Sequence, residues 1–73
     1  MFNKYCKIVI DCTCLITKER VRVERETFGL NNAKGIVNDY KARQKPNILS
    51  NITIVNAYDK VIYSDSYTSR KVA

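Results

Sequence analysis

Three cysteines near the start of the chain, Cys6, Cys12 and Cys14, are the residues whose chemistry stands out first. A C-x-C pair can hold a metal ion, and a thiolate can act as a nucleophile. In an extended strand, however, Cys6 and Cys12 lie about 20 Å apart at ~3.3 Å per residue. The chain also contains no histidine to complete a zinc site or to serve as the base. We therefore expect buried free thiols, with no metal and no cofactor.

The acidic residues and the glycines also argue against catalysis. The aspartates are spread over separate segments, and the glutamates of the 20–28 segment alternate with arginines, as on a solvated strand. The two glycines of the chain are too few for a Gly-rich phosphate loop. The sequence therefore predicts that the protein is not an enzyme and has no catalytic residues.

Basic side chains on a predicted helix form a candidate nucleic-acid site. The chain has 13 Lys and Arg against 7 Asp and Glu, a net charge of +6, and the surplus is concentrated between residues 30 and 46. A ridge of lysines on one helix face can follow a phosphate backbone and replace its counterions. The alternative is a lysine-rich face that is merely solvated. The candidate residues are Lys34, Lys41, Arg43 and Lys45.

A second candidate surface lies on the outward side of the first predicted strand. Tyr5, Val9 and Leu15 are unusually apolar for a row of side chains that faces water. This indicates that a protein partner or a second copy of the chain covers the row. Tyr63 and Tyr67 share a face of the last predicted strand, where they either stack on bases or form the edge of the core.

Two strands are predicted in the first half of the chain. Apolar residues occupy every even position of residues 6–16, a period of two that indicates a strand with one buried face. Residues 20–28 form a second strand, the hairpin partner of the first, with a charged outer face. Arg25 interrupts its apolar pattern. Either the strand leaves the core there, or a bulge turns Phe28 inward.

One helix and two further strands are predicted in the second half. Asn31 or Asn32 caps a helix that Pro46 terminates. Strands follow over residues 48–55 and 61–67, and residues 69–73 form a frayed basic tail. The apolar stripe of the helix, at the spacing of a face packed on a sheet, consists of Ala33, Ile36, Val37, Tyr40 and the stem of Gln44.

These elements predict an α+β fold. Residues 1–73 form a single small domain in the order β-β-α-β-β, a mostly antiparallel four-stranded sheet with one amphipathic helix on one face. A core of this size supplies about 3–5 kcal/mol, so homodimerisation is an open alternative. Residues 1–11 lack the apolar core and the small-residue cleavage site that are typical of a signal peptide, and no apolar run approaches ~18 residues. We expect a protein of the cytoplasm of a bacterial or host cell, with no membrane contact.

The expected function is that of a small non-enzymatic binding protein acting through protein–protein contact, with a partner or by self-association. In size, charge and layout alone, the chain is similar to the short accessory proteins that phages encode to bind and redirect host enzymes. The alternative is nucleic-acid binding through the basic helix face. No RNP, KH or helix-turn-helix signature is present, so such binding would be weakly sequence-specific.

Overall fold

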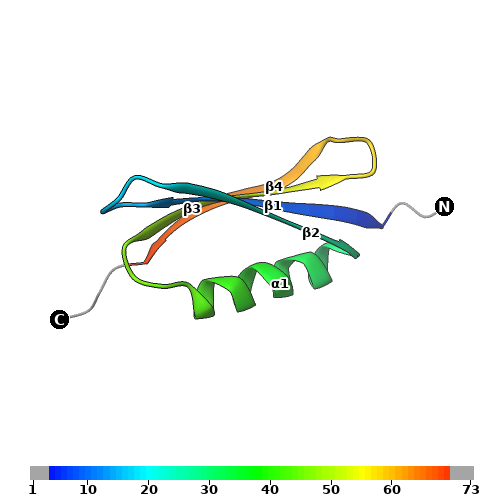
Figure 1. Cartoon of the computed structure of the whole chain (residues 1–73). Helices are drawn as coiled ribbons and strands as arrows, with labels where there is room; N and C mark the ends of the chain where they lie inside the picture. The colour runs from blue at the N-terminus through cyan, green and yellow to red at the C-terminus, as the bar shows by residue number, and fades with distance from the viewer. Residues whose placement is uncertain (1–3, 70–73) are drawn as a thin grey trace.

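The computed structural model describes residues 4–69 and confirms the predicted α+β fold. Four antiparallel strands form one sheet in the order β2-β1-β3-β4, and a single helix lies against one of its faces (Figure 1). We call that side of the sheet the helix face and the opposite side the open face. The elements are β1 (Tyr5–Cys14), β2 (Arg20–Phe28), α1 (Leu30–Arg43), β3 (Ile48–Asn56) and β4 (Val61–Ser69).

The core forms where α1 packs on β1 and β3. Every second side chain of β1 points to the helix face, as the alternation predicts, and the same holds for the isoleucines of β3. Ile8 lies opposite Ile54 and Ile10 opposite Ile52, so four buried branched side chains meet beneath the helix. The helix contributes two buried residues, Ala33 and Val37.

A polar cluster joins the end of α1 to the sheet. The Cys12 sulfur lies 2.6 Å from the Tyr40 hydroxyl and 3.6 Å from that of Ser50, which is fully buried. Ser50 donates to the side-chain carbonyl of Gln44, whose amide nitrogen donates to the Ile48 carbonyl at 3.0 Å. Gln44 thus follows the helix as its C-cap and acts through its amide, and it does not extend the predicted apolar stripe.

The thiols follow the sequence prediction with one exception. All three cysteines are free, and Cys6 and Cys12 are buried. Cys14 is only half-buried, because it is the last residue of β1 and lies beyond the end of the helix. Within residues 4–69 no group of three His, Cys, Asp or Glu side chains is placed to hold a metal ion.

Of the two alternatives given for Arg25, the bulge in β2 is wrong. The β1–β2 register runs without interruption from Tyr5 opposite Phe28 to Thr13 opposite Arg20. Arg25 therefore stays on the helix face opposite Ile8, and its guanidinium donates to the Glu24 carbonyl at 3.3 Å. Phe28 stays on the open face and is 65% exposed. Along a strand with a regular register, side chains alternate strictly between the two faces of the sheet, so the Phe28 side chain cannot turn toward the core.

The predicted helix cap is also wrong, because the residue at the cap position is Gly29, two residues before Asn31 and three before Asn32. Gly29 precedes the helix with φ +90°, a left-handed conformation that favours glycine, and its carbonyl accepts from the Ala33 amide at 3.0 Å. Asn31 and Asn32 lie inside the first turn. The Asn32 side chain donates to the Phe28 carbonyl at 2.8 Å instead of capping the helix, which tethers α1 to β2.

The C-terminal ends of two strands differ from the prediction by two residues. β1 ends at Cys14, whose carbonyl accepts from the Lys18 amide at 2.8 Å, so Leu15 and Ile16 belong to the turn. β4 continues to Ser69, the first residue of the predicted frayed tail, and the rest of that tail lies outside the described residues. In the described part of the chain no helix is long and apolar enough to cross a membrane.

Shortening one core side chain should measure how tightly this core is packed. Ile54 is fully buried, so Ile54→Val is expected to lower the free energy of unfolding by about 0.5–1.5 kcal/mol. Ile16→Val, at a turn residue that is 72% exposed, should change it by less than about 0.5 kcal/mol. Urea unfolding followed by circular dichroism provides the comparison, and equal effects of the two substitutions would contradict the assigned core.

Candidate interaction surfaces

Two of the four predicted nucleic-acid-binding residues cover tyrosines on β4. The backbone of the helix lies nearest to β1 and β2, so the sheet extends past it on the β4 side. Lys41 reaches across, placing its ammonium 2.6 Å from the Asp65 carboxylate and 5.5 Å from the centre of the Tyr67 ring. Lys34 lies two turns earlier on the same face of the helix, and its ammonium is 5.3 Å from the centre of the Tyr63 ring. Both lysines thus serve as a cover for the outer strand.

The Lys41–Asp65 pair shifts the titration of both groups. The hydrogen bond to Asp65 raises the pKa of Lys41, and partial burial of the ammonium opposes that rise. The pKa of Asp65 is lowered, mainly by the hydrogen bond from Lys41 and next by the Ser66 amide, which donates at 2.8 Å. Each charge is therefore stabilised by the other in the folded protein.

The other two predicted nucleic-acid-binding residues lie at the end of α1. Arg43 forms an exposed ion pair with Asp39 at 3.6 Å, one turn earlier on the helix. Lys45 is exposed and makes no ion pair with any residue between 4 and 69. The four side chains do not form one unneutralised ridge, because Lys41 and Arg43 each have a carboxylate partner.

The structure separates the three residues of the predicted protein interface. Val9 is only 9% exposed, since Glu24 and Thr53 flank it on the open face. Tyr5 begins β1 and Leu15 follows its end, a separation of about 33 Å at ~3.3 Å per residue. Tyr5 and Leu15 therefore cannot belong to the same small patch, and Val9 is already covered by its own chain.

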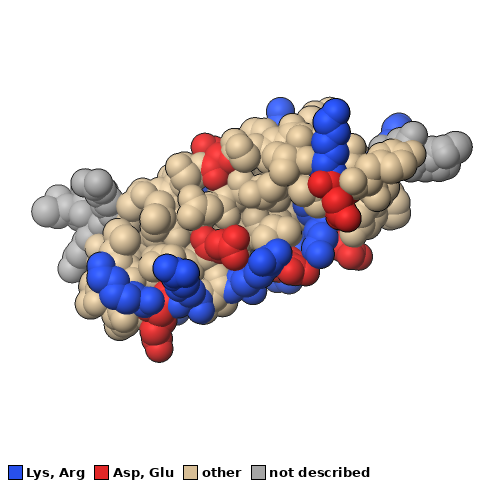
Figure 2. Space-filling model, turned by 90° about the horizontal axis from the view of Figure 1, so that it is seen from above, with Lys and Arg blue, Asp and Glu red and all other residues tan. Residues whose placement is uncertain are grey.

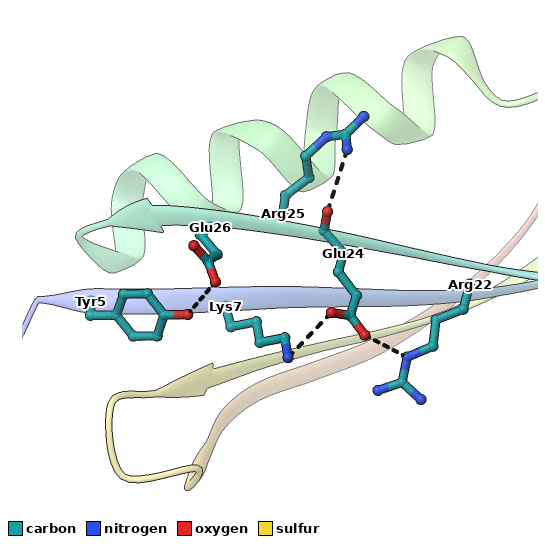
Figure 3. A network of polar contacts seen from close by, with 6 residues as sticks. All are labelled: Tyr5, Lys7, Arg22, Glu24, Arg25 and Glu26. Atoms are coloured by element: carbon teal, nitrogen blue, oxygen red, sulfur yellow. Dashed lines mark hydrogen bonds and ion pairs between the residues drawn. The ribbon is translucent and has the colours of Figure 1, made fainter.

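The open face has an uncharged centre and a charged edge. Figure 2 shows a largely uncharged surface along the sheet, with basic and acidic side chains gathered along one long edge. That edge is formed by β2, and Figure 3 shows its contacts with β1. Glu24 pairs with Lys7 at 3.2 Å and with Arg22 at 3.0 Å, and these two cations lower its pKa, with Lys7 the larger cause.

The same network leaves two charges incompletely paired. Glu26 accepts a hydrogen bond from the Tyr5 hydroxyl at 2.9 Å but has no cation partner within the described range. Arg20, at the other end of β2, makes no ion pair with residues 4–69. The β2 edge thus carries one free charge of each sign on its open face.

An aromatic corner, formed by Tyr5, Phe28 and Ile62, lies where β1, β4 and α1 begin and β2 and β3 end. The rings of Tyr5 and Phe28 meet edge to face with centroids 6.2 Å apart and an interplanar angle of 71°. Ile62 is the extra residue of a register shift between β3 and β4. A cavity of about 600 Å³ opens beside the corner, lined by Lys4, Tyr5, Cys6, Phe28, Gly29, Leu30, Asn31, Asn32, Asn56 and Ile62.

Of the three residues of the aromatic corner, only Tyr5 was predicted from the sequence as part of an interaction surface, and Phe28 and Ile62 were not. For Phe28 the signal was available, because its even position matches Glu24 and Glu26 and so predicts the open face. For Ile62 no signal was available, since a bulge depends on how two strands pair. Comparison of the chain with protein-family models, with curated proteins and with solved structures finds no match.

The Lys41–Asp65 pair predicts a defined pH dependence of stability. Asp65 has a lowered pKa, so its contribution is complete above the unfolded value of about 3.9 and is lost as the pH falls through the folded value. Lys41 has a raised pKa, so its contribution is complete below about 10.4 and is lost as the pH rises through the folded value.

We therefore expect Asp65→Asn to lower the free energy of unfolding by a constant amount between about pH 5 and 8, and by less as the pH falls below about 4. Urea unfolding at several pH values measures this difference. The control is Lys41→Met, because Asp65→Asn should cost much less in that background. A loss that is the same at every pH would show that the pair does not stabilise the fold.

Proposed function

We propose that this protein is a non-enzymatic binding protein that acts through protein–protein contact and is anchored at the aromatic corner. The observation that carries the proposal is Phe28, a large apolar side chain that is 65% exposed and lies beside a cavity. Phe is one of the aromatic residues enriched in protein interfaces, and aromatic anchors that fill pockets are typical hot spots of binding energy. Tyr5 holds the Phe28 ring from one side, which limits the entropy lost on binding.

The lining of the cavity supports a partner of particular chemistry. Its walls combine the apolar side chains of the corner with the amide side chains of Asn31, Asn32 and Asn56. Such amides can donate to and accept from a peptide backbone. Lys4 is the one charged residue of the lining. An extended protein segment that inserts a large apolar side chain, with an acidic residue nearby, suits this combination.

The contacts of the helix lysines favour this proposal over nucleic-acid binding. A phosphate backbone would have to compete with Asp65 for Lys41 and with Asp39 for Arg43. Lys34 and Lys45 keep their charge available, and two such contacts supply only weak, strongly salt-dependent binding. Protein contact through an apolar anchor has little dependence on salt.

Removing the Phe28 ring should abolish capture of the partner. Photocrosslinking from a benzophenone residue at position 28, in extract of the cells that make the protein, is expected to yield one dominant adduct. Unlabelled wild-type protein should compete for that adduct, and Phe28→Ser should compete about 30-fold less well or worse, as expected for a hot-spot side chain.

The matched control is Ile16→Ser, an equally exposed apolar residue in the turn at the far end of the sheet. This variant should compete like wild type, and the adduct should persist in 0.5 M NaCl. Equal loss of competition in both variants would contradict the corner as the anchor. Binding of an oligonucleotide pool that disappears between about 50 and 200 mM NaCl would favour the basic residues instead.

A further inference from the structure

The charged residues of β2 form a pattern that is complementary to itself. The open face of the strand presents Arg20, Arg22, Glu24 and Glu26 in order, two cations followed by two anions. Antiparallel pairing of two identical strands reads this row in opposite directions. In one register, the numbers of opposing residues add up to 46. Arg20 then lies opposite Glu26 of the second copy and Arg22 opposite Glu24, and the two-fold symmetry makes each of these pairs occur twice.

No neighbouring register has this property. When two copies of β2 pair antiparallel, even-numbered residues lie opposite even-numbered residues, and odd opposite odd. The sum of opposing residue numbers can therefore change only in steps of two, to 44 or to 48. One step down places Arg22 opposite Arg22 of the second copy, and one step up places Glu24 opposite Glu24. Like charges directly opposite each other destabilise a strand pair, and opposite charges stabilise it. The charge pattern therefore selects a single register.

We propose that β2 is the homodimer interface of this protein. Two copies pair their β2 edges antiparallel about a two-fold axis at Val23, which makes one continuous eight-stranded sheet. β2 is an edge strand of the sheet, so one side of its backbone has no strand partner in the monomer. The interface is isologous, as in most homodimers.

The unpaired charges of the monomer find partners in this dimer. Arg20 has no ion pair and Glu26 no cation partner among residues 4–69, and the register places them opposite each other. Arg22 and Glu24 already contact each other at 3.0 Å along the strand, so they can pair across the axis without leaving a charge unpaired. Lys7 stays within reach of Glu24.

The helix face of β2 supplies the apolar part of the interface. Val21 is 61% exposed and Val23 is half-buried, although both point toward the helix layer. Cavities of about 270 and 380 Å³ lie between these valines and the end of α1. The two-fold axis brings Val23 against Val23 of the second copy and Val21 opposite the stem of Arg25, which removes apolar surface from water. Both helices lie on the same face of the joined sheet.

Reversing charges tests the pairing. Light scattering of wild-type protein should give twice the 8.4 kDa of one chain. Arg20→Glu with Arg22→Glu makes the row entirely acidic, and Glu24→Arg with Glu26→Arg makes it entirely basic, so each variant should be monomeric. An equimolar mixture of the two should recover the dimer, which a folding defect in either variant would not permit. A monomeric wild type, or variants that stay dimeric, would overturn the proposal.

Disulfide trapping tests the register. In a Cys14→Ser background, Val23→Cys places two thiols directly opposite each other, about 5 Å apart between Cβ atoms. Oxidised glutathione should convert them to an intermolecular disulfide that non-reducing electrophoresis detects. Val21→Cys is the matched control, because its two copies lie about 13 Å apart along the strands. Trapping at position 21, or at neither position, would overturn this register.

The dimer and the aromatic corner can be tested separately. In this register residue 28 lies opposite position 18, which is outside β2 of the second copy. Phe28→Ser should therefore remain dimeric while it loses capture of the partner. A Phe28→Ser variant that becomes monomeric would overturn the β2 register, whereas failure to capture any partner would leave the dimer intact and remove only the proposed function.

Discussion

A single helix has to cover a four-stranded sheet, and the rest of the structure follows from that mismatch. The 14 residues of α1 span about 21 Å, whereas the 10 residues of β1 span about 33 Å. With side chains the helix is about 10–12 Å wide, enough for two or three strands spaced ~4.8 Å apart. Part of the helix face, the whole open face and both edges must be made compatible with water by other means.

Charged side chains perform much of this work. On the helix face, Lys34 and Lys41 extend their apolar stems over the tyrosines of β4, and Asp65 neutralises one of the two charges. On the open face, Lys7 and Arg22 surround Glu24. Three of the four basic residues that resemble a nucleic-acid site in the sequence, Lys34, Lys41 and Arg43, therefore have structural partners in the fold. Net charge alone does not separate these two uses of lysine.

The two edges of the sheet have different character. β4 carries one charged side chain, Asp65, which points to the helix face and is held by Lys41. β2 carries five, and the four on its open face are ordered so that they repel most partners and match a second copy in one register. Charged edges protect sheets against unspecific pairing. A self-complementary order keeps that protection and adds one permitted partner, which also helps so small a core.

The sequence by itself determined the element order, the strand character of β1 and β2 and the buried side chains of β1, because a period of two depends only on local backbone geometry. It did not determine the strand order, the cap of the helix at Gly29 or the register shift at Ile62. The candidate sites show the same division. Lys41 and Asp65 are 24 residues apart, and Tyr5 and Phe28 are 23 apart. Only the pairing of distant strands and the packing of the helix on the sheet bring such residues into contact, and neither can be predicted from the residue types or their spacing.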